Sequence, residues 1–264
     1  MIDALQSAPS TDRIERAERL APSFEVQLRF ARRMAELTGR PLGETVLDGT
    51  HLHRRFGLGI PRRSPISETW AAYARGLEAT DSLADQLALT LATYRAAADE
   101  VWPLPGQTGF GCFADEPPNA EGVVRIHFYN LDTDEDGGPL ARAKLDRRRA
   151  DLAALTRHAV EAFPQARRIA GRSWLYNLEA YRRLFPPDYA ASRAPASEPI
   201  RLVGTSSWGQ LIDSRQAIRP DVRDALLANL DRLDPAAPWR VFPHQVQAVS
   251  APVESFVEFY GLGA

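Results

Sequence analysis

The sequence is poor in several features that define protein classes. Cys112 is the only cysteine among 264 residues, which excludes a disulfide within the chain and a zinc site built from several cysteines. No stretch approaches the roughly 18 apolar residues that a membrane-spanning helix needs. No basic segment followed by an apolar run marks a secretory signal near the first residue. We therefore expect a cytoplasmic protein that has no membrane partner.

An excess of charge of one sign is also missing. The formal net charge is −2, and hydrophobic and charged residues make up 44% and 25% of the chain. Such a balance is ordinary for a globular protein and gives no field that would attract nucleic acid. Lys144 is the only lysine, so almost all positive charge is arginine. This bias is typical of a GC-rich genome, and we expect a bacterial source.

The first part of the chain predicts helices, and we assign residues 1–105 to a helical N-terminal region that packs on or caps a sheet. Apolar side chains such as Trp70, Tyr73 and Leu77 recur at helical spacing, and Ser82-x-x-Asp85 forms a capping box at the start of one segment. Pro103 and Pro105 end that segment. The predicted helices cover residues 11–20, 23–37, 65–79 and 82–101.

From Gly106 onward the pattern alternates between strands and helices. We therefore assign residues 106–264 to an α/β (α+β) core with a mixed, mostly antiparallel sheet flanked by helices. Val123 to Tyr129 is the clearest strand, and a long amphipathic helix ending before Pro164 follows it. The predicted strands cover residues 108–114, 123–129, 168–173, 200–205 and 239–242, with 249 as the alternative end of the last one. The predicted helices cover residues 139–163, 178–185, 220–233 and 252–260.

An acidic loop joins the strand at 123–129 to the long helix. Its sequence, Asp132-Thr133-Asp134-Glu135-Asp136-Gly137, resembles the opening of a calcium loop. Asp132, Asp134 and Asp136 are candidate ligands of a divalent cation. Position twelve of such a loop is Ala143, however, which cannot supply the bidentate carboxylate. The alternative is a solvated loop near the positive end of the following helix.

Four histidines are candidates for chemistry: His51, His53, His127 and His244, which lies near a strand end. His51 and His53 form an H-x-H pair that could bind zinc, although two arginines follow directly. His127 lies within a strand and shares its face with Arg125 and Tyr129. It is either a general base or a hydrogen-bonded core histidine. His158 is expected to be exposed on the arginine-bearing face of the long helix.

Polar and aromatic residues follow two of the predicted strands. Ser173, Trp174 and Asn177 follow the strand at 168–173, where open α/β sheets bind ligands. Ser206 and Trp208 occupy a similar place after the predicted strand at 200–205. The two groups could line one pocket with the tryptophans as apolar walls. Alternatively, Asn177 caps a helix and both tryptophans are packing residues.

The segment from Asn177 to Phe185, N-L-E-A-Y-R-R-L-F, resembles the asparagine-to-aromatic helix of the GNAT superfamily of acyl-CoA-dependent N-acyltransferases. The resemblance extends in element order over residues 107–249. It implies that the strands at 123–129 and 168–173 splay apart to receive acyl-CoA. It also implies His127 or Glu179 as base, Tyr181 as the acid for a thiolate leaving group, and Ser173 and Asn177 as cleft contacts. The substrate would be the amine of a small molecule or a peptide.

The acidic loop departs from this pattern, because the superfamily holds a pyrophosphate there with a glycine-rich basic loop. Carboxylates beside a phosphate repel it by about 1 kcal/mol per close pair in water. Gly137 and Gly138 keep the required backbone geometry possible. The sequence thus leaves three hypotheses open: an N-acyltransferase, a non-catalytic binding or partner protein that has lost the cofactor, and a metal-dependent enzyme. It does not specify the oligomeric state.

Overall fold

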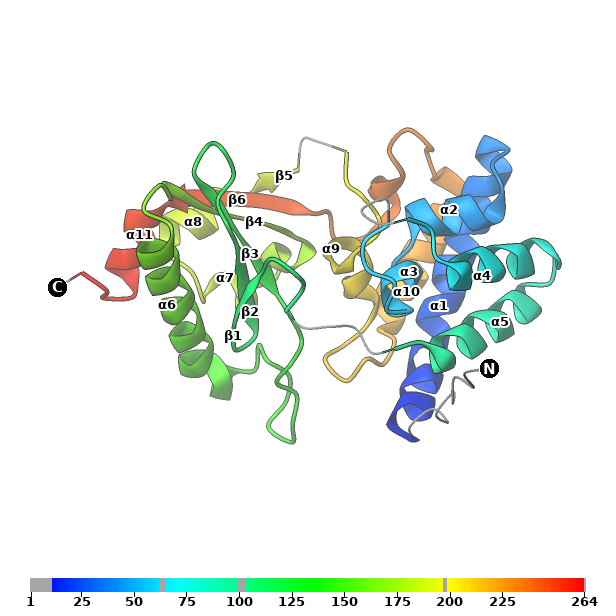
Figure 1. The fold of residues 1–264 in the computed structure, drawn as a ribbon, viewed down its shortest axis with the longest axis horizontal. Helices are drawn as coiled ribbons and strands as arrows, with labels where there is room; N and C mark the ends of the chain where they lie inside the picture. Colours follow the sequence, from blue (N-terminus) through cyan, green and yellow to red (C-terminus); the bar gives the residue numbers. More distant parts are fainter. Residues whose placement is uncertain (1–10, 62–64, 99–102, 197–198, 264) are drawn as a thin grey trace, which may run out of the picture. The chain divides into compact units, whose positions relative to one another are not determined.

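The computed structural model describes residues 11–61, 65–98, 103–196 and 199–263. Its contacts divide the chain into two compact units, shown in Figure 1. The helical unit comprises Met1–Glu100 and Pro199–Pro243, and the sheet unit comprises Val101–Glu198 and His244–Ala264. The sequence-based boundary near residue 105 left the segment 199–243 in the sheet region, whereas its contacts place it in the helical unit.

The helical unit forms around α1, a helix of 28 residues that continues through Pro22. The sequence predicted a break at this proline, but burial of Leu20, Phe24 and Leu28 along one face outweighs the loss of a backbone hydrogen bond. Trp70 and Tyr73 of α4 are buried in the same cluster, as their spacing predicted. The helices of this unit are α1 (Thr11–Thr38), α2 (Leu42–Gly49), α3 (Leu52–Arg55), α4 (Glu68–Glu78), α5 (Leu83–Ala96), α9 (Thr205–Trp208) and α10 (Pro220–Asn229).

Two strands that the sequence predicts in this part of the chain do not form. Residues 200–204 form no strand, and α9 begins at Thr205. Residues 238–241 form a short 3-10 helix that starts at Pro238. The pattern of apolar side chains in both segments predicts strands. In the structure these side chains pack in a cluster with Phe30 of α1. A short apolar run carries the same pattern whether it packs as a strand or as an irregular segment.

The sheet unit contains a six-stranded sheet in the order β1-β2-β3-β4-β6-β5. All neighbouring pairs are antiparallel except β3 and β4, which are parallel. The last strand of the chain, β6, lies between β4 and the short β5. The mixed, mostly antiparallel sheet flanked by helices is therefore confirmed. The strands are β1 (Thr108–Phe110), β2 (Phe113–Glu116), β3 (Val123–Phe128), β4 (Arg168–Ser173), β5 (Ala194–Pro195) and β6 (Gln247–Pro252).

A long helix, α6 (Leu145–Ala162), connects the two parallel strands. It begins later than the predicted start at Pro139, because a 3-10 turn over Arg142–Lys144 precedes it. The helix predicted at 178–185 is shorter in the structure, and a separate helix, α8, begins at Pro187. A proline is well suited to the first turn of a helix, where its missing N–H has no partner to lose. The remaining helices are α7 (Glu179–Arg182), α8 (Pro187–Ala191) and α11 (Val253–Phe259).

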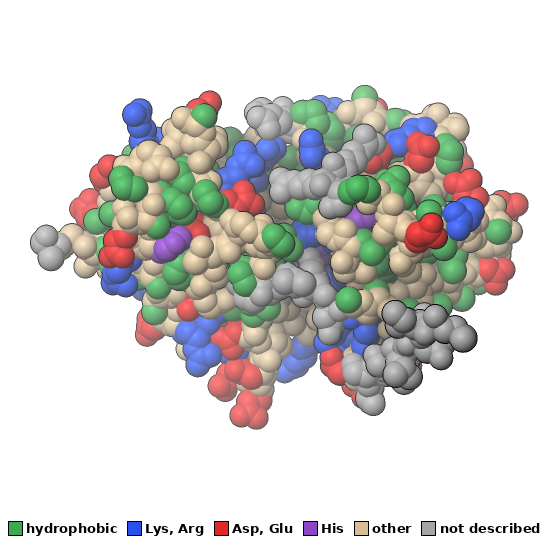
Figure 2. Space-filling view, viewed as in Figure 1, with side chains coloured by type: hydrophobic (Ala, Val, Ile, Leu, Met, Phe, Trp, Pro, Cys, Tyr) green, Lys and Arg blue, Asp and Glu red, His purple; other side chains and the backbone are tan. Residues whose placement is uncertain are grey.

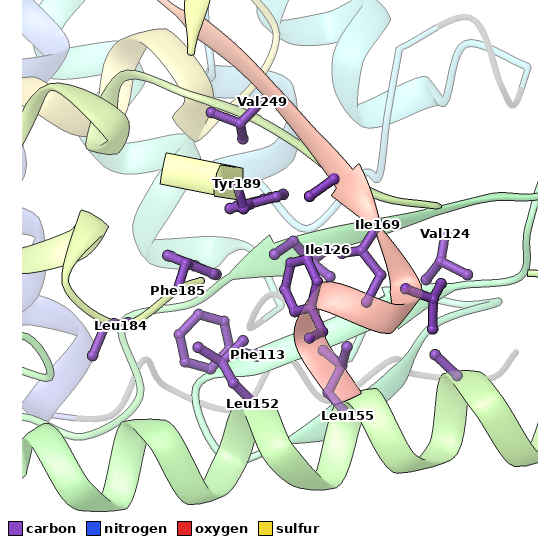
Figure 3. Close-up of a cluster of buried hydrophobic side chains, with 14 of the residues drawn as sticks. Phe113, Val124, Ile126, Leu152, Leu155, Ile169, Leu184, Phe185, Tyr189 and Val249 are labelled. Atoms are coloured by element: carbon purple, nitrogen blue, oxygen red, sulfur yellow. The ribbon is translucent and has the colours of Figure 1, made fainter. Parts of the chain in front are cut away.

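The core of the sheet unit lies on one face of the sheet. Alternate positions of the strands point toward α6, and Leu152 and Leu155 of that helix point back at them, as Figure 3 shows. Side chains from α7, α8 and α11 enter the same cluster. Positions between these, such as Arg125 and Arg168, are exposed. Among the described residues, no helix has the length and apolarity needed to cross a membrane.

Candidate functional site

Pairing between the two parallel strands ends near the predicted site. β3 and β4 pair at three successive positions, of which the last joins Arg125 and Ala170. Beyond it, β3 stays paired with β2 as far as Phe128, and β4 stays paired with β6 as far as Ser173. Pairing between β3 and β4 therefore ends partway along both strands.

Buried aromatic rings pack on the core face beside the point where this pairing ends. The ring centroid of Tyr181 lies 5.4 Å from that of Phe128 and 5.0 Å from that of Tyr176. Tyr181 is 2% exposed, and burial raises its pKa well above the usual value. A phenol in this environment keeps its proton and is held by its neighbours. The placement does not favour the predicted role of Tyr181 as the acid for a leaving group.

The backbone of β4 touches two of these tyrosines. The hydroxyl groups of Tyr176 and Tyr189 lie 2.8 Å apart and form a hydrogen bond. A Cβ atom at Gly171 would overlap the hydroxyl oxygen of Tyr176 and lie 2.6 Å from that of Tyr189. Only glycine lets the strand approach the tyrosines this closely.

The acidic loop folds back on the start of α6 and surrounds Lys144. The Lys144 Nζ lies 2.9 Å from the carbonyl oxygen of Asp132, 3.1 Å from its Oδ1 and 3.0 Å from the carbonyl oxygen of Gly137. A fourth oxygen, Oδ1 of Asp134, is 2.8 Å away. Asp134 and Gly137 also exchange two backbone hydrogen bonds, which close the loop into a tight turn. The only lysine of the chain is thus only 5% exposed and fully partnered.

Asp132 links this turn to the next cations of the helix. Its Oδ2 accepts hydrogen bonds from Arg147 Nη1 at 3.0 Å and from Arg148 Nη2 at 2.8 Å. Arg148 is 2% exposed, and its Nε lies 3.3 Å from Oδ2 of Asp151. The Arg148 guanidinium also contacts the sulfur of Cys112, whose backbone N–H donates to Asp151. One carboxylate therefore joins three cationic side chains at the beginning of α6.

These contacts keep the carboxylates ionised. Hydrogen bonding from Lys144 lowers the pKa of both Asp132 and Asp134 below the usual value. Burial opposes the charge of Lys144, but the carboxylates of Asp134 and Asp132 outweigh it and raise the pKa of the ammonium group. The loop is consequently an ion-pair network rather than a cluster of repelling carboxylates.

The predicted cation ligands do not converge in this loop. Asp134 Oδ1 accepts a hydrogen bond from the backbone N–H of Asp136 at 3.0 Å, and the Asp136 side chain is exposed. Among the described residues, no group of three histidine, cysteine, aspartate or glutamate side chains is arranged to hold a metal ion. The cationic partners of Asp132 and Asp134 are side chains of the protein itself.

His127 lies on the other face of the sheet, beside a carboxylate that the sequence did not reveal. Its Nε2 is 3.0 Å from Oε1 of Glu116, and both side chains are about one-third exposed. Gln107 donates to the same Oε1 at 3.2 Å and accepts a hydrogen bond from the Tyr129 hydroxyl at 2.7 Å. Hydrogen bonding from His127 lowers the pKa of Glu116 to about 2. The predicted base therefore has a carboxylate partner and access to solvent.

This pair gives a testable prediction. Replacing His127 by leucine should raise the pKa of Glu116 from about 2 toward its usual 4.5, because the hydrogen bond that favours the carboxylate is lost. The lowered pKa stabilises the fold above pH 4.5, and that contribution disappears as the pH falls toward 2. The side-chain carboxyl resonance of Glu116 reports the pKa in an NMR titration. Arg125→Gln, which removes a weaker influence, is the control, and an equal shift in both variants would contradict this account.

The three predicted site residues at the end of β4, Ser173, Trp174 and Asn177, have structural partners. Ser173 Oγ accepts a hydrogen bond from the backbone N–H of Leu175 at 3.2 Å. Asn177 Nδ2 donates to the carbonyl oxygens of Trp174 and Gln245 at 2.7 and 2.9 Å. The indole of Trp174 is 7% exposed and stacks on His244. These bonds tie the turn to the segment before β6. Burial of Trp174 matches the predicted packing role, but the predicted cap is wrong, because Leu178 is the N-cap residue of α7 and no side chain caps that helix.

The other predicted site residues are dispersed. Ser206 and Trp208 belong to the helical unit, whereas Ser173 and Trp174 belong to the sheet unit. Trp208 is buried, and its Nε1 donates to two backbone carbonyl groups within its own unit. Glu179 is exposed in the first turn of α7. The structure therefore gives Trp208 a packing role.

The H-x-H pair is buried within the helical unit. His51 is 2% exposed, and desolvation together with nearby arginines lowers its pKa well below the usual value. His53 is 6% exposed, and its Nδ1 lies 2.9 Å from the carbonyl oxygen of Gly59. The two rings thus occupy a packed interior.

A second histidine–carboxylate pair was missed from the sequence. His158 was expected to be exposed, but its Nδ1 lies 2.7 Å from Oδ2 of Asp115, which is fully buried. The rings of Phe110 and Phe163 flank the imidazole at 5.2 and 5.3 Å. Burial raises the pKa of Asp115. Asp115 lies on β2, and His158 lies on α6. No local sequence pattern predicts a contact between two residues that are 43 positions apart.

Comparison with protein-family models, with curated proteins and with solved structures finds no match to this chain. The functional argument consequently depends on the geometry alone.

Proposed function

We propose that this chain is a non-catalytic binding or partner protein on an acyltransferase-like scaffold, in which Asp132 stands where a cofactor's pyrophosphate would bind. The observation that carries the proposal is the set of contacts between one Asp132 carboxylate and three cations, Lys144, Arg147 and Arg148.

The scaffold supports this reading through its strand arrangement. A parallel pair joined by a long helix, with pairing that ends partway along the strands, is what the resemblance to the N-acyltransferase superfamily implies. In that superfamily the loop before the long helix receives a pyrophosphate. The start of a helix attracts an anion, and cationic side chains there strengthen the attraction.

In this chain an internal anion meets the same cations. Asp132 uses its backbone carbonyl oxygen and both side-chain oxygens to bond Lys144, Arg147 and Arg148. An external phosphate would have to displace this carboxylate, which is covalently attached and therefore present at a high effective concentration. It would also approach Asp134 and the exposed Glu135. Binding of acyl-CoA should therefore be disfavoured.

Isothermal calorimetry with acetyl-CoA and longer acyl-CoA thioesters, with and without Mg²⁺, tests the proposal. The wild-type protein should give no binding heat under either condition. Asp132→Asn, which keeps the shape but removes the anion, should bind inorganic pyrophosphate, because Asp134 and Asp151 still hold the remaining cations in place. Saturable binding of acyl-CoA by the wild type would contradict the proposal. So would purified monomer that turns over a substrate while pull-downs recover no stable partner.

A second candidate is the N-acyltransferase itself, and the His127–Glu116 pair favours it. A histidine held by a carboxylate and open to solvent can accept a proton from an attacking amine. The substrate would be a small-molecule or peptide amine, and acyl-CoA the donor. Acyl transfer to a panel of amines, lost in His127→Leu, would support this candidate and overturn the first.

The proposal also includes the setting in which the protein acts. We infer that it works in the cytoplasm and binds neither nucleic acid nor a membrane, from the net charge of −2 and the single cysteine.

A further inference from the structure

An open groove of about 690 Å³ lies between the end of α6 and α11, within the sheet unit. Its size falls in the range of sites that hold a small ligand or a few side chains of a partner. It is separate from the acidic loop, which lies at the opposite end of α6. Residues lining the groove include Val160, Phe163, Ala166, Val253, Glu254, Val257 and Glu258.

The α6 wall of the groove is apolar, and so is Val257 on α11. Val160 is 44% exposed. Val257 and Phe163 are half-buried beside it. An apolar side chain inserted here would remove all three from water, at about 25 cal/mol for each Å² of apolar surface.

The other wall carries two carboxylates without cationic partners. Glu254 and Glu258 are exposed and lie four residues apart on α11, so they share one face of the helix. Within the described part of the chain, neither side-chain carboxylate forms a hydrogen bond or an ion pair. Asp132, Asp134 and Asp151, by contrast, all face cations of their own unit. The groove therefore offers negative charge beside apolar surface.

The walls are held in place before anything binds. Phe163 packs edge-on against His158, whose Nδ1 is fixed by Asp115. On the opposite wall, Ser255 Oγ donates to Asp188 at 2.6 Å and the Tyr260 hydroxyl donates to the Leu184 carbonyl oxygen at 2.8 Å. A groove that is already formed loses little conformational entropy on binding.

We propose that this groove binds a segment of a partner protein that combines an apolar anchor with two basic side chains spaced about one helical turn apart. The apolar side chain would contact Val160 and Val257, and the arginines or lysines would pair with Glu254 and Glu258. Figure 2 shows hydrophobic and acidic side chains next to one another over the end of the sheet unit that α6 and α11 form. This inference rests on the proposed function as a partner protein and names the chemistry of the partner.

Two matched peptides test the inference by fluorescence anisotropy on the full chain. Both are short and amphipathic with leucine on one face, and they carry either arginine or glutamate at two positions one turn apart. The arginine peptide should bind, and the double variant Glu254→Gln/Glu258→Gln should weaken it about tenfold or more. Val160→Asp should weaken it as well. Glu135→Gln, an exposed carboxylate of the acidic loop, is the control and should leave the affinity unchanged.

Several results would overturn the inference. It fails if the arginine peptide does not bind, if the glutamate peptide binds equally well, or if the double variant binds like the control. Sedimentation that reveals a dimer of the wild type, lost in the double variant, would make a second copy of this chain the occupant instead. If neither the peptide nor acyl-CoA binds, the groove proposal fails and the proposed function still holds. If acyl-CoA binds, the proposed function fails, but that result does not test binding at the groove.

Discussion

Replacing Arg148 by methionine is expected to destabilise the protein by about 3–5 kcal/mol, the range found when one partner of a buried ion pair is removed. Arg148 is 2% exposed and contacts the carboxylates of both Asp132 and Asp151. Methionine fills a similar volume but leaves these carboxylates close together with one cation fewer. The free energy of unfolding from urea titration measures the effect.

Arg147→Met is the matched control for this prediction. Arg147 pairs with the same Asp132 carboxylate, but its side chain is 62% exposed. Exposed pairs contribute about 1 kcal/mol or less. If Arg147→Met destabilised the protein as much as Arg148→Met, the buried network could not be what holds the loop on α6.

The second large effect is expected at Gly171. A methyl group there would overlap the Tyr176 hydroxyl and press on that of Tyr189, so Gly171→Ala should destabilise the protein by about 3 kcal/mol. Removing the obstructing oxygen with Tyr176→Phe should recover about 1 kcal/mol of this loss in the double variant. The same unfolding measurement applies to each variant of the cycle.

Gly263→Ala serves as the control for Gly171→Ala. An added Cβ at Gly263 would lie 3.9 Å from Val257, an ordinary contact distance. Its unfolding free energy should stay close to that of the wild type. A Gly171→Ala variant as stable as Gly263→Ala would show that the tyrosines do not pack on β4 as the structure describes.

Sequence patterns predicted the elements whose packing is local. The alternation at 123–129 placed His127 on one face with Arg125, and the structure confirms this with buried Val124 and Ile126 on the other face. The alternative of a core histidine is wrong, because the His127 side chain is 33% exposed. The spacing of Trp70, Tyr73 and Leu77 likewise identified the buried face of α4. Periodicity works in these cases because each element buries one face against a single core.

Features that depend on distant parts of the chain were not predictable. Glu116 meets His127 only because β2 and β3 pair in one register, and Asp115 meets His158 only because α6 crosses the sheet. The sequence pattern assigned the segment 199–243 to the sheet region, although its contacts place it in the helical unit. On α5 the buried positions include Gln86, which a hydrophobic pattern cannot reveal.

The acidic loop shows that a count of charges in the sequence does not predict which charges pair in the fold. The sequence suggested several carboxylates repelling a phosphate, and it left open whether a cation neutralised them. The structure shows Lys144, Arg147 and Arg148 in that role. Their positions along the helix are visible in the sequence, but the fold-back of Asp132 onto them is set by the turn between Asp134 and Gly137.

The single lysine provides the most direct test of the central claim, which is that Asp132 takes the place of an external phosphate. Labelling with ¹⁵N-lysine gives one backbone amide signal, from Lys144 at the start of α6. The account predicts that this signal stays in place when acetyl-CoA or pyrophosphate is added to the wild type, and that pyrophosphate shifts it in Asp132→Asn. A saturable shift in the wild type, or no shift in the variant, would contradict the claim.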